Sequence, residues 1–260
     1  MPNDPPATVT PVPAATILLV RDGRKGLEVF MMERHAAIGF AAGALVFPGG
    51  KVDQEDSDPA LIARCEGCDG LTEDEKALRV AAIRETLEES GVLLARRRGE
   101  NEFVSPAELE VSLDAGDKKG FLRFIDEANL SLACDALIPF AHWITPERNP
   151  KRYDTHFFIA HAPEGQKAVH DGWESVESIW IPPQAAIADG EAGRRYVMFP
   201  TKLNLEKLDR SATAAEAIDA ARSWRIVEVM PIMRIVDGER ILTIPEEAEY
   251  GASEFILSNE

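Results

Sequence analysis

The segment most able to do chemistry runs from Arg84 to Val92 and places one arginine beside several carboxylates. It reads Arg-Glu-Thr-Leu-Glu-Glu-Ser-Gly-Val. On a helix, with about 100° between residues, Glu85, Glu88 and Glu89 share one face. Arg84 adjoins Glu85 and precedes Glu88 by one helical turn, so it can orient a carboxylate. Oxygen ligands in this number suit Mg2+ or Mn2+, which keep bound water and also bind phosphates.

The opposite face of the same helix is aliphatic. Val80, Ile83 and Leu87 fall there, which indicates that this face packs on a core. The helix is expected to end at Gly91, a residue typical of helix C-termini. Clustered carboxylates in the last turns repel one another and oppose the helix dipole, and a divalent cation relieves both effects. A solvated acidic face is the alternative for such a cluster in isolation.

The segment resembles the second half of the Nudix box, Gly-x5-Glu-x7-Arg-Glu-U-x-Glu-Glu-x-Gly-U, where U is aliphatic. Thr86 stands at one U position. The glycine that best matches the start of the box is Gly50, in a Pro-Gly-Gly turn after a short apolar strand. From Gly50 to Arg84 there are 33 intervening residues, 20 more than the 13 of the plain box. We therefore expect an insertion inside the box, and its first glutamate is not identified.

Other stretches are similar to the peroxisomal coenzyme A diphosphatase branch of the Nudix hydrolases, of which this chain would be a bacterial-type homologue. They are Arg34-His35, Gly39-Phe40-x-x-Gly43, His142-Trp143-Ile144-Thr145-Pro146 and Arg152-Tyr153-Asp154-Thr155-His156. The resemblance implies metal-dependent attack of water on a diphosphate phosphorus. Coenzyme A or acyl-CoA would give 3′,5′-ADP and (acyl-)4′-phosphopantetheine.

The same resemblance implies roles for the box residues. Glu85, Glu88 and Glu89 would bind Mg2+ or Mn2+, with the carbonyl of Gly50 as a further ligand. Arg84 would hold Glu85 in place. The general base varies within the family and is not assigned.

Residues outside the box are further candidates. Glu174 and Glu177 could each supply an additional acid, with a surface position as the alternative. The candidates for substrate contact are Arg34, His35, Phe40, His142 and Arg152. A hydrogen-bonded structural histidine is the alternative for His35 and His142.

Two other functions are open. One is a pyrophosphatase for ADP-ribose or another nucleoside diphosphate derivative, because base and ribose contacts lie outside the box. The other is a non-catalytic Nudix module that binds a regulatory ligand. Such modules commonly lose box glutamates, so the presence of all three glutamates here favours catalysis.

Composition restricts the partners. The chain has 260 residues and a formal net charge of −17, which argues against binding nucleic acid. Its apolar runs are too short to span a membrane, so we expect a cytoplasmic protein with a small-molecule nucleotide substrate. A homodimer is left open. The chain has three cysteines, and the Cys65-x-x-Cys68 pair could be redox-active or half of a zinc site. Two reduced thiols in a loop is the favoured interpretation, because Cys134 is distant in sequence and no pair of histidines lies near.

The order of elements predicts an α/β (α+β) protein, a Nudix-type α/β/α sandwich with a mixed sheet. We expect a flexible tail at 1–13, a Nudix domain at 14–208 and a C-terminal extension at 209–260 packed on the same domain. Within the domain, the insertion is expected at about 53–73 and extra helices at about 105–130. Strands are predicted at 14–20, 27–34, 45–47, 92–94, 136–144, 153–161 and 176–181, helices at 75–90, 117–129, 200–208 and 212–222, and a hairpin at 232–244.

Overall fold

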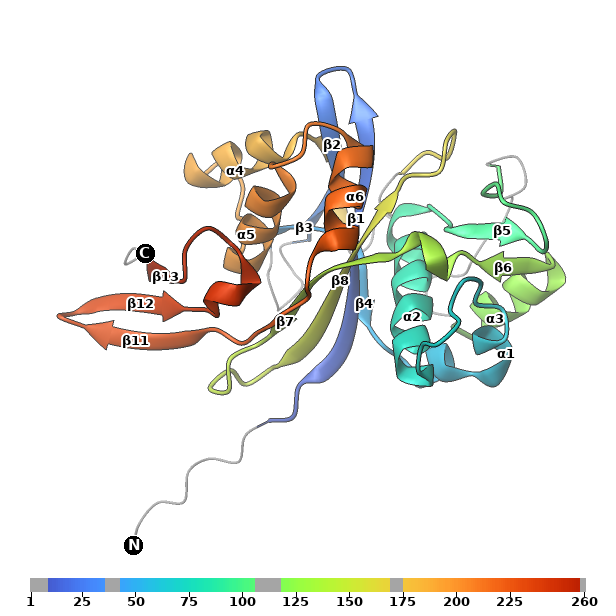
Figure 1. Cartoon of the computed structure of the whole chain (residues 1–260), viewed down its shortest axis with the longest axis horizontal. Helices are drawn as coiled ribbons and strands as arrows, with labels where there is room; N and C mark the ends of the chain where they lie inside the picture. The colour runs from blue at the N-terminus through green and yellow to red at the C-terminus, as the bar shows by residue number, and fades with distance from the viewer. Residues whose placement is uncertain (1–8, 36–42, 106–117, 169–174, 258–260) are drawn as a thin grey trace, which may run out of the picture.

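A central mixed sheet organises the chain in a computed structural model that describes residues 9–35, 43–105, 118–168 and 175–257 (Figure 1). Within these residues the sheet has eight strands, in the order β10-β7-β8-β1-β2-β3, with β4 paired to β1 and β9 paired to β2. The strands are β1 (Val12–Gly23), β2 (Gly26–Arg34), β3 (Leu45–Val46), β4 (Gly49–Lys51), β7 (Ile138–Ile144), β8 (Tyr153–His161), β9 (Ser175–Ile181) and β10 (Glu228–Val229).

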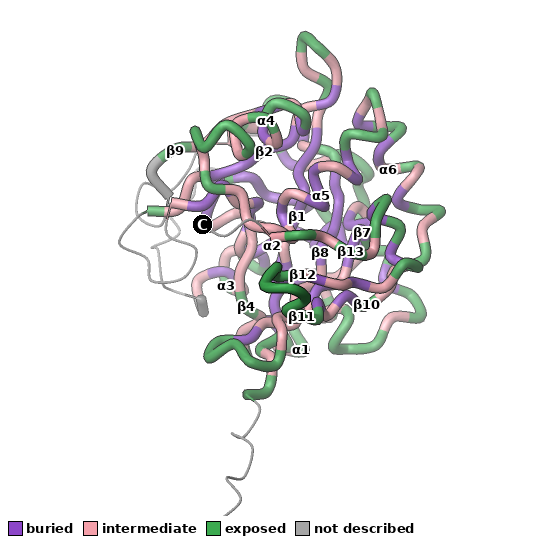
Figure 2. The backbone as a smooth tube through the Cα atoms, turned by 90° about the vertical axis from the view of Figure 1, so that its left-hand side faces the viewer, coloured by how far each residue is buried: buried purple, intermediate pink, exposed green. Residues whose placement is uncertain are grey.

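Strand β1 lies in the middle of the sheet and is buried on both faces (Figure 2). It pairs with β2 in the antiparallel sense and with β8 in the parallel sense. Because side chains alternate along a strand, Leu18 and Val20 enter one apolar cluster and Ile17 and Leu19 enter the other. The continuous apolar run of β1 is therefore explained by a core on each side of the sheet.

Helices cover both faces of the sheet, which confirms the expected α/β/α sandwich (Figure 1). On the face that carries Ile17 and Leu19 lie α1 (Pro59–Ile62), α2 (Glu73–Ser90), α3 (Lys118–Glu127) and the small sheet of β5 (Ala95–Arg97) and β6 (Leu130–Leu132). On the other face lie α4 (Pro183–Glu191), α5 (Phe199–Leu208) and α6 (Ala214–Ser223).

Helix α2 begins two residues before the predicted start. The hydroxyl of Thr72 accepts from the backbone of Glu75, and the Glu75 carboxylate accepts from the backbone of Thr72, which is a capping box. The helix ends at Gly91, whose φ of 70° favours glycine. No helix in the described part of the chain is long and apolar enough to cross a membrane.

A separate three-stranded sheet projects from the body (Figure 1). It contains β11 (Ile232–Val236), β12 (Glu239–Thr243) and β13 (Glu254–Leu257). The predicted hairpin is present, and Asp237 and Gly238 both have positive φ, as a tight two-residue turn requires. Ile232, Ile235 and Ile256 are exposed on this sheet.

The expected strand at 92–94 is absent. The Gln166 side-chain amide accepts from the backbone N–H of Leu93 at 2.9 Å and donates to its carbonyl at 3.1 Å. A side chain therefore satisfies the backbone groups that a neighbouring strand would otherwise pair, and sequence periodicity does not reveal such a partner. The short helix expected to begin at 105–106 lies outside the described residues.

Candidate active site

The side chain of Arg84 is the centre of the site and is only 1% exposed. Its Nε and Nη2 donate to the two carboxylate oxygens of Asp56 at 2.8 and 2.9 Å. Its Nη1 donates to Glu85 at 2.8 Å and to Glu88 at 3.0 Å. Burial alone lowers the pKa of Arg84, but the hydrogen bonds to Asp56 and the nearby carboxylate charges outweigh it and raise that pKa. The guanidinium is therefore a permanent cation at the centre of an acidic cluster.

Arg84 also joins helix α2 to the turn after β4. Its Nη2 donates to the carbonyl of Lys51 at 3.1 Å and lies 3.2 Å from Asp53 Oδ2. One planar side chain thus contacts the helix and the turn at once, and its fork geometry fixes their relative position.

Asp56 is a site residue that sequence reasoning missed. It is fully buried in the short 3-10 helix η1 (Gln54–Ser57) and accepts a further hydrogen bond from the backbone of Asp53. Five residues separate it from Gly50, which is the spacing of the first box glutamate, with aspartate in place of glutamate. The signal was therefore available in the spacing. Residues 53–56, expected to begin the insertion, hold Arg84 instead, and the extra residues follow Asp56.

The two glycines of the turn approach the glutamates closely. The backbone N–H of Gly49 donates to Glu89 Oε2 at 2.8 Å. A side chain at Gly50 would place its Cβ only 2.5 Å from the carboxylate carbon of Glu85. Glycine at 49 is required by β1, because a Cβ there would lie 2.4 Å from the carbonyl oxygen of Ala15, and glycine at 50 leaves room for the Glu85 carboxylate.

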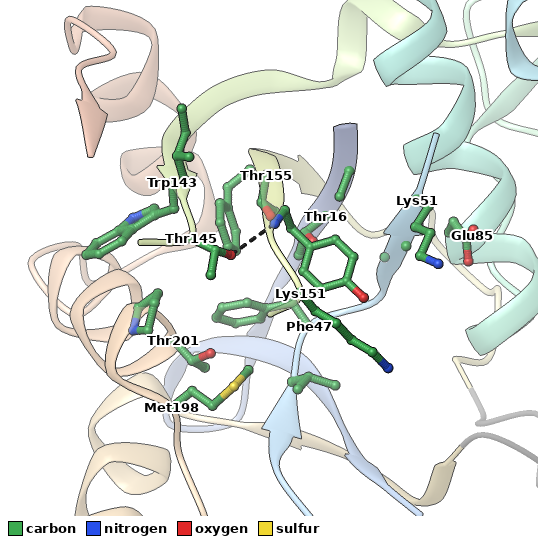
Figure 3. Close-up of a pocket in the computed structure, with 18 of the residues that line it drawn as sticks. Thr16, Phe47, Lys51, Glu85, Trp143, Thr145, Lys151, Thr155, Met198 and Thr201 are labelled. Carbon is green, nitrogen blue, oxygen red and sulfur yellow. Dashed lines mark hydrogen bonds between the residues drawn. The ribbon is translucent and has the colours of Figure 1, made fainter. Parts of the chain in front are cut away.

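A cavity of about 710 Å3 opens beside these residues (Figure 3). Glu85 and Lys51 lie at one side, whereas Trp143, Met198 and Thr201 lie at the other. Its charged lining residues are Arg34, Lys51, Lys151, Asp53, Glu85 and Glu89.

The donor set beside the cavity fits a divalent metal of the Mg2+ or Mn2+ kind. Glu85 and Glu89 present carboxylates and Gly50 lines the same wall, so the available donors are oxygens. Glu88 belongs to the same cluster through Arg84 and is not among the lining residues.

The residues predicted to contact substrate are divided between the cavity and other places. Arg34 lines the cavity, and the exposed His35 at the end of β2 does not. Phe40 lies outside the described residues. His142 and Arg152 point elsewhere, and their sequence neighbours line the cavity instead: Trp143, Lys151 and Tyr153.

Arg152 is buried and holds the backbone together. Its guanidinium donates to the carbonyl of Thr145 at 2.9 Å and to the carbonyl of Val9 at 2.7 Å. These hydrogen bonds give Arg152 a structural role at the start of β8.

His142 belongs to a cluster on the face of the sheet away from Trp143. Its ring stacks on His156 with 4.0 Å between the centroids, and its Nε2 is hydrogen-bonded to Asp154. Burial is the main reason that the pKa of His156 is lowered to about 4, and repulsion from His142 adds to it.

Glu177, one of the two candidates for an additional acid, stands apart from the cavity lining that the structure describes. Glu177 on β9 pairs with Arg195 at 2.9 Å, and Arg195 also binds Glu33 at 2.9 Å. This hydrogen bond to Glu177 is the largest contribution to a raised pKa of Arg195. Glu174 lies outside the described residues.

Comparison with known proteins agrees with this geometry. Residues 59–208 match the family model of the NUDT19 Nudix domain. The acyl-coenzyme A diphosphatase NUDT19 of Xenopus laevis is 25% identical over 86% of this chain and 71% of its own length. "Putative nudix hydrolase 7" of Caenorhabditis elegans is 27% identical over 76% of this chain, and the match spans only 60% of that protein.

A solved structure gives the same result for the fold. The crystal structure of a NUDIX hydrolase from Alicyclobacillus acidocaldarius superposes with a TM-score of 0.70 at 27% identity, over 82% of this chain and 97% of that one. The fold and the box therefore define a Nudix hydrolase, a class of enzymes that generally uses divalent metal ions. Within that class, the chain belongs to the family of the NUDT19 Nudix domain.

Replacement of Asp56 tests the buried ion pair. Asp56→Asn leaves the guanidinium of Arg84 with too little negative charge, and we expect the free energy of unfolding to fall by about 3–5 kcal/mol. Asp56→Glu keeps the charge and restores the usual box residue, so its loss should be smaller. Urea denaturation of both variants measures this, and an unchanged free energy of unfolding in Asp56→Asn would contradict the role of the pair.

The lowered pKa of His156 predicts a dependence of stability on pH. Between about pH 6.5 and the folded-state value of about 4, the unfolded chain binds a proton that the folded protein does not. The free energy of unfolding should therefore fall as pH falls through this range. The groups that act on His156 are His142, Asp154, Arg79 and Glu75.

His156→Gln removes this titration. Denaturation with urea at about pH 7 and about pH 5 should show a smaller difference in the variant than in the wild type. Equal differences in the two proteins would show that His156 does not carry the effect.

Proposed function

We propose that the protein hydrolyses the diphosphate of coenzyme A or acyl-CoA, giving 3′,5′-ADP and (acyl-)4′-phosphopantetheine. The observation that carries this proposal is a single cavity with carboxylates and cations beside one part and an apolar wall beside another. The name of the Xenopus relative, an acyl-coenzyme A diphosphatase, supports it.

The carboxylate side is where the diphosphate would react. Glu85, Glu88 and Glu89, with the carbonyl of Gly50, would hold Mg2+ or Mn2+. When bound, such an ion neutralises phosphate oxygens and lowers the pKa of coordinated water. The contribution of Arg84 is to fix Glu85 and Glu88 through 2.8 and 3.0 Å hydrogen bonds, so that the carboxylates need little rearrangement.

Positive side chains beside the carboxylates would bind the phosphates. Arg34, Lys51 and Lys151 line the cavity, and Lys51 lies beside Glu85 while Lys151 lies farther along (Figure 3). Lys151 therefore suits a phosphate remote from the reacting diphosphate, such as the 3′-phosphate of coenzyme A. These local charges offset the long-range repulsion that a net charge of −17 exerts on an anionic substrate.

The apolar wall would bind the uncharged parts of the substrate. Tyr153 is half-buried and offers a ring on which adenine can stack. Farther from Glu85 lie Trp143 and Met198 (Figure 3), and Phe157 and Pro200 also line the cavity. This apolar wall suits a pantetheine arm or an acyl chain. Trp143 is held in the core by its hydrogen bond to the Tyr250 hydroxyl at 2.9 Å.

Two further expectations stay predictions. The first is a cytoplasmic location, which is expected from the sequence. A homodimer would be expected to use the exposed apolar side chains of the three-stranded sheet, such as Ile232 and Ile235.

Substitution of the box glutamates tests the assignment of the metal ligands. Glu85→Gln, Glu88→Gln and Glu89→Gln should each lower kcat at least about a hundredfold, because a lost ligand removes roughly 3 kcal/mol or more of transition-state stabilisation. EDTA should abolish activity in the wild type, and Mg2+ or Mn2+ should restore it.

Glu191→Gln is the matched control, since Glu191 ends α4, does not line the cavity and forms its ion pair with Lys202. This variant should retain wild-type turnover. Activity that persists in Glu89→Gln at the level of Glu191→Gln would refute the assignment.

A substrate panel tests the specificity. Coenzyme A, an acyl-CoA and ADP-ribose should be compared by kcat/KM with Mg2+ and with Mn2+, and the products identified by mass spectrometry. We expect coenzyme A or the acyl-CoA to be cleaved with the highest kcat/KM. Faster cleavage of ADP-ribose would favour the ADP-ribose alternative, and binding without cleavage of any compound would favour a regulatory module.

A further inference from the structure

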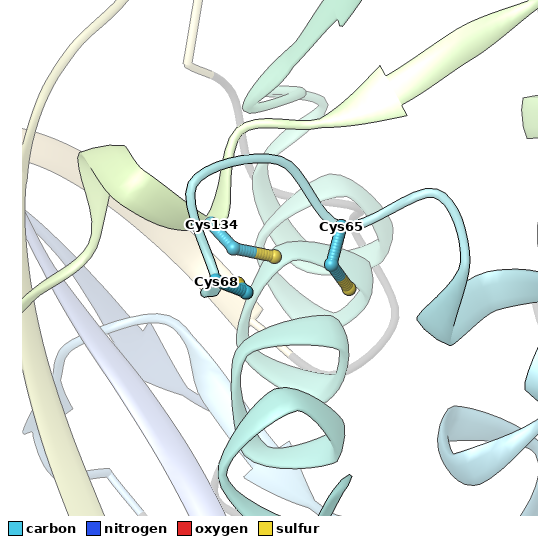
Figure 4. A group of neighbouring side chains, drawn as sticks. All are labelled: Cys65, Cys68 and Cys134. Carbon is cyan, nitrogen blue, oxygen red and sulfur yellow. The ribbon is translucent and has the colours of Figure 1, made fainter. Parts of the chain in front are cut away.

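All three cysteines of the chain meet at one place outside the candidate active site. Cys134 follows the pair Cys65 and Cys68 by more than sixty residues, yet the three Sγ atoms lie within 4.8 Å of one another (Figure 4). All three are free thiols, Cys68 and Cys134 being buried and Cys65 partly exposed. Sequence spacing indicated only an isolated pair, because the third thiol comes from a distant segment.

Backbone hydrogen bonds hold the two cysteine segments together. The N–H of Leu132 donates to the carbonyl of Arg64 at 2.8 Å, and the N–H of Glu66 donates to the carbonyl of Leu132 at 2.9 Å. Gly67 has a φ of +66°, and a Cβ there would lie 2.3 Å from the Cβ of Asp135. The loop is thus built for close approach to the segment that carries Cys134.

Charged side chains reinforce the same junction. Arg96 donates to Asp135 at 2.6 Å and lies 3.8 Å from Glu66, so it joins the neighbours of Cys134 and Cys65. Arg79 and Lys76 are close enough to Cys68 to favour its thiolate. A hydrogen bond with Cys134 is the largest cause that lowers the pKa of Cys68, to about 7. The pKa of Cys134 is raised, mainly by hydrogen bonds with the other two thiols.

We propose that Cys65, Cys68 and Cys134 bind one thiophilic divalent cation, Zn2+, through three thiolates, with solvent as the fourth ligand. Cysteine thiolates are preferred zinc ligands, and zinc sites with three protein ligands keep water in the fourth position. Zinc–sulfur bonds of about 2.3 Å in a tetrahedron place the sulfurs roughly 3.8 Å apart, a spacing that falls within the 4.8 Å limit observed for these thiols. Each thiol loses its proton on binding, so affinity rises with pH.

The partial exposure of Cys65 leaves the fourth position open to water. The ion would join the segment between Asp56 and α2 to the segment that carries β6, which packs beside the same helix. The ion would therefore stabilise the helix that carries the box. Its site is separate from the carboxylate site.

Metal binding by the purified full-length protein tests the proposal. After dialysis against EDTA and a thiol reductant, the wild type should bind one equivalent of Zn2+ that protects the cysteines from a thiol reagent. Co2+ in place of Zn2+ should give thiolate-to-cobalt charge-transfer absorption. Zn2+ should also raise the Tm, because it binds the folded state.

Cys65→Ser changes the partly exposed ligand and is the variant least prone to misfold, whereas Cys134→Ser changes a buried one. Both should lose the cobalt–thiolate absorption, bind Zn2+ at least about tenfold more weakly and show no rise of Tm. Glu89→Gln is the control for metal at the carboxylate site and should keep the absorption. The proposal is overturned by the absence of that absorption in the wild type, by unchanged Zn2+ affinity in Cys65→Ser, or by a Cys65–Cys68 disulfide that forms in place of metal binding.

Discussion

The buried guanidinium of Arg84 is the interaction on which the site depends. An unpaired charge in the interior is strongly unfavourable, so the protein has to surround this cation with acceptors. Asp56 and the Lys51 carbonyl supply them from the turn, and Glu85 and Glu88 supply them from α2. The turn and the helix therefore hold one relative position, and the glutamates cluster at the C-terminal end of α2, where helix dipole and mutual repulsion oppose them.

The charge distribution follows from the same arrangement. A chain with a net charge of −17 repels phosphorylated substrates at long range, whatever its fold. At the cavity the balance is different, because Arg34, Lys51 and Lys151 lie among the acidic lining residues. Local cations act over short distances in a partly desolvated space, where their effect is stronger than that of distant surface charge, and a divalent ion held by the glutamates would act in the same way.

Much of the fold was predictable where local patterns are strong. The strand at 153–161 matches its prediction, and α2 differs from its prediction by two residues at the N-terminus.

Local patterns failed where the partner is distant in sequence. The Gln166 side chain replaces a strand beside Leu93, and Cys134 completes a cluster with Cys65 and Cys68. Along β7 and β8, successive side chains point to opposite faces of the sheet, so the sequence alone does not tell which residues face the cavity. Trp143 and Tyr153 line the cavity, whereas His142 and Asp154 do not. Asp56 was missed because the residues from 53 onward were assigned to the insertion, so the box spacing from Gly50 was not followed to an aspartate.

A double-mutant cycle of Asp56→Asn and Arg84→Gln, measured on kcat/KM for the hydrolysis of coenzyme A, tests most directly whether this ion pair positions the carboxylates. If the two residues act as one unit, the double variant should lose about as much kcat/KM as either single variant, because the second substitution removes an interaction that is already broken. Losses that multiply in the double variant would show that Asp56 and Arg84 act independently, and would contradict the view that the buried pair organises the site.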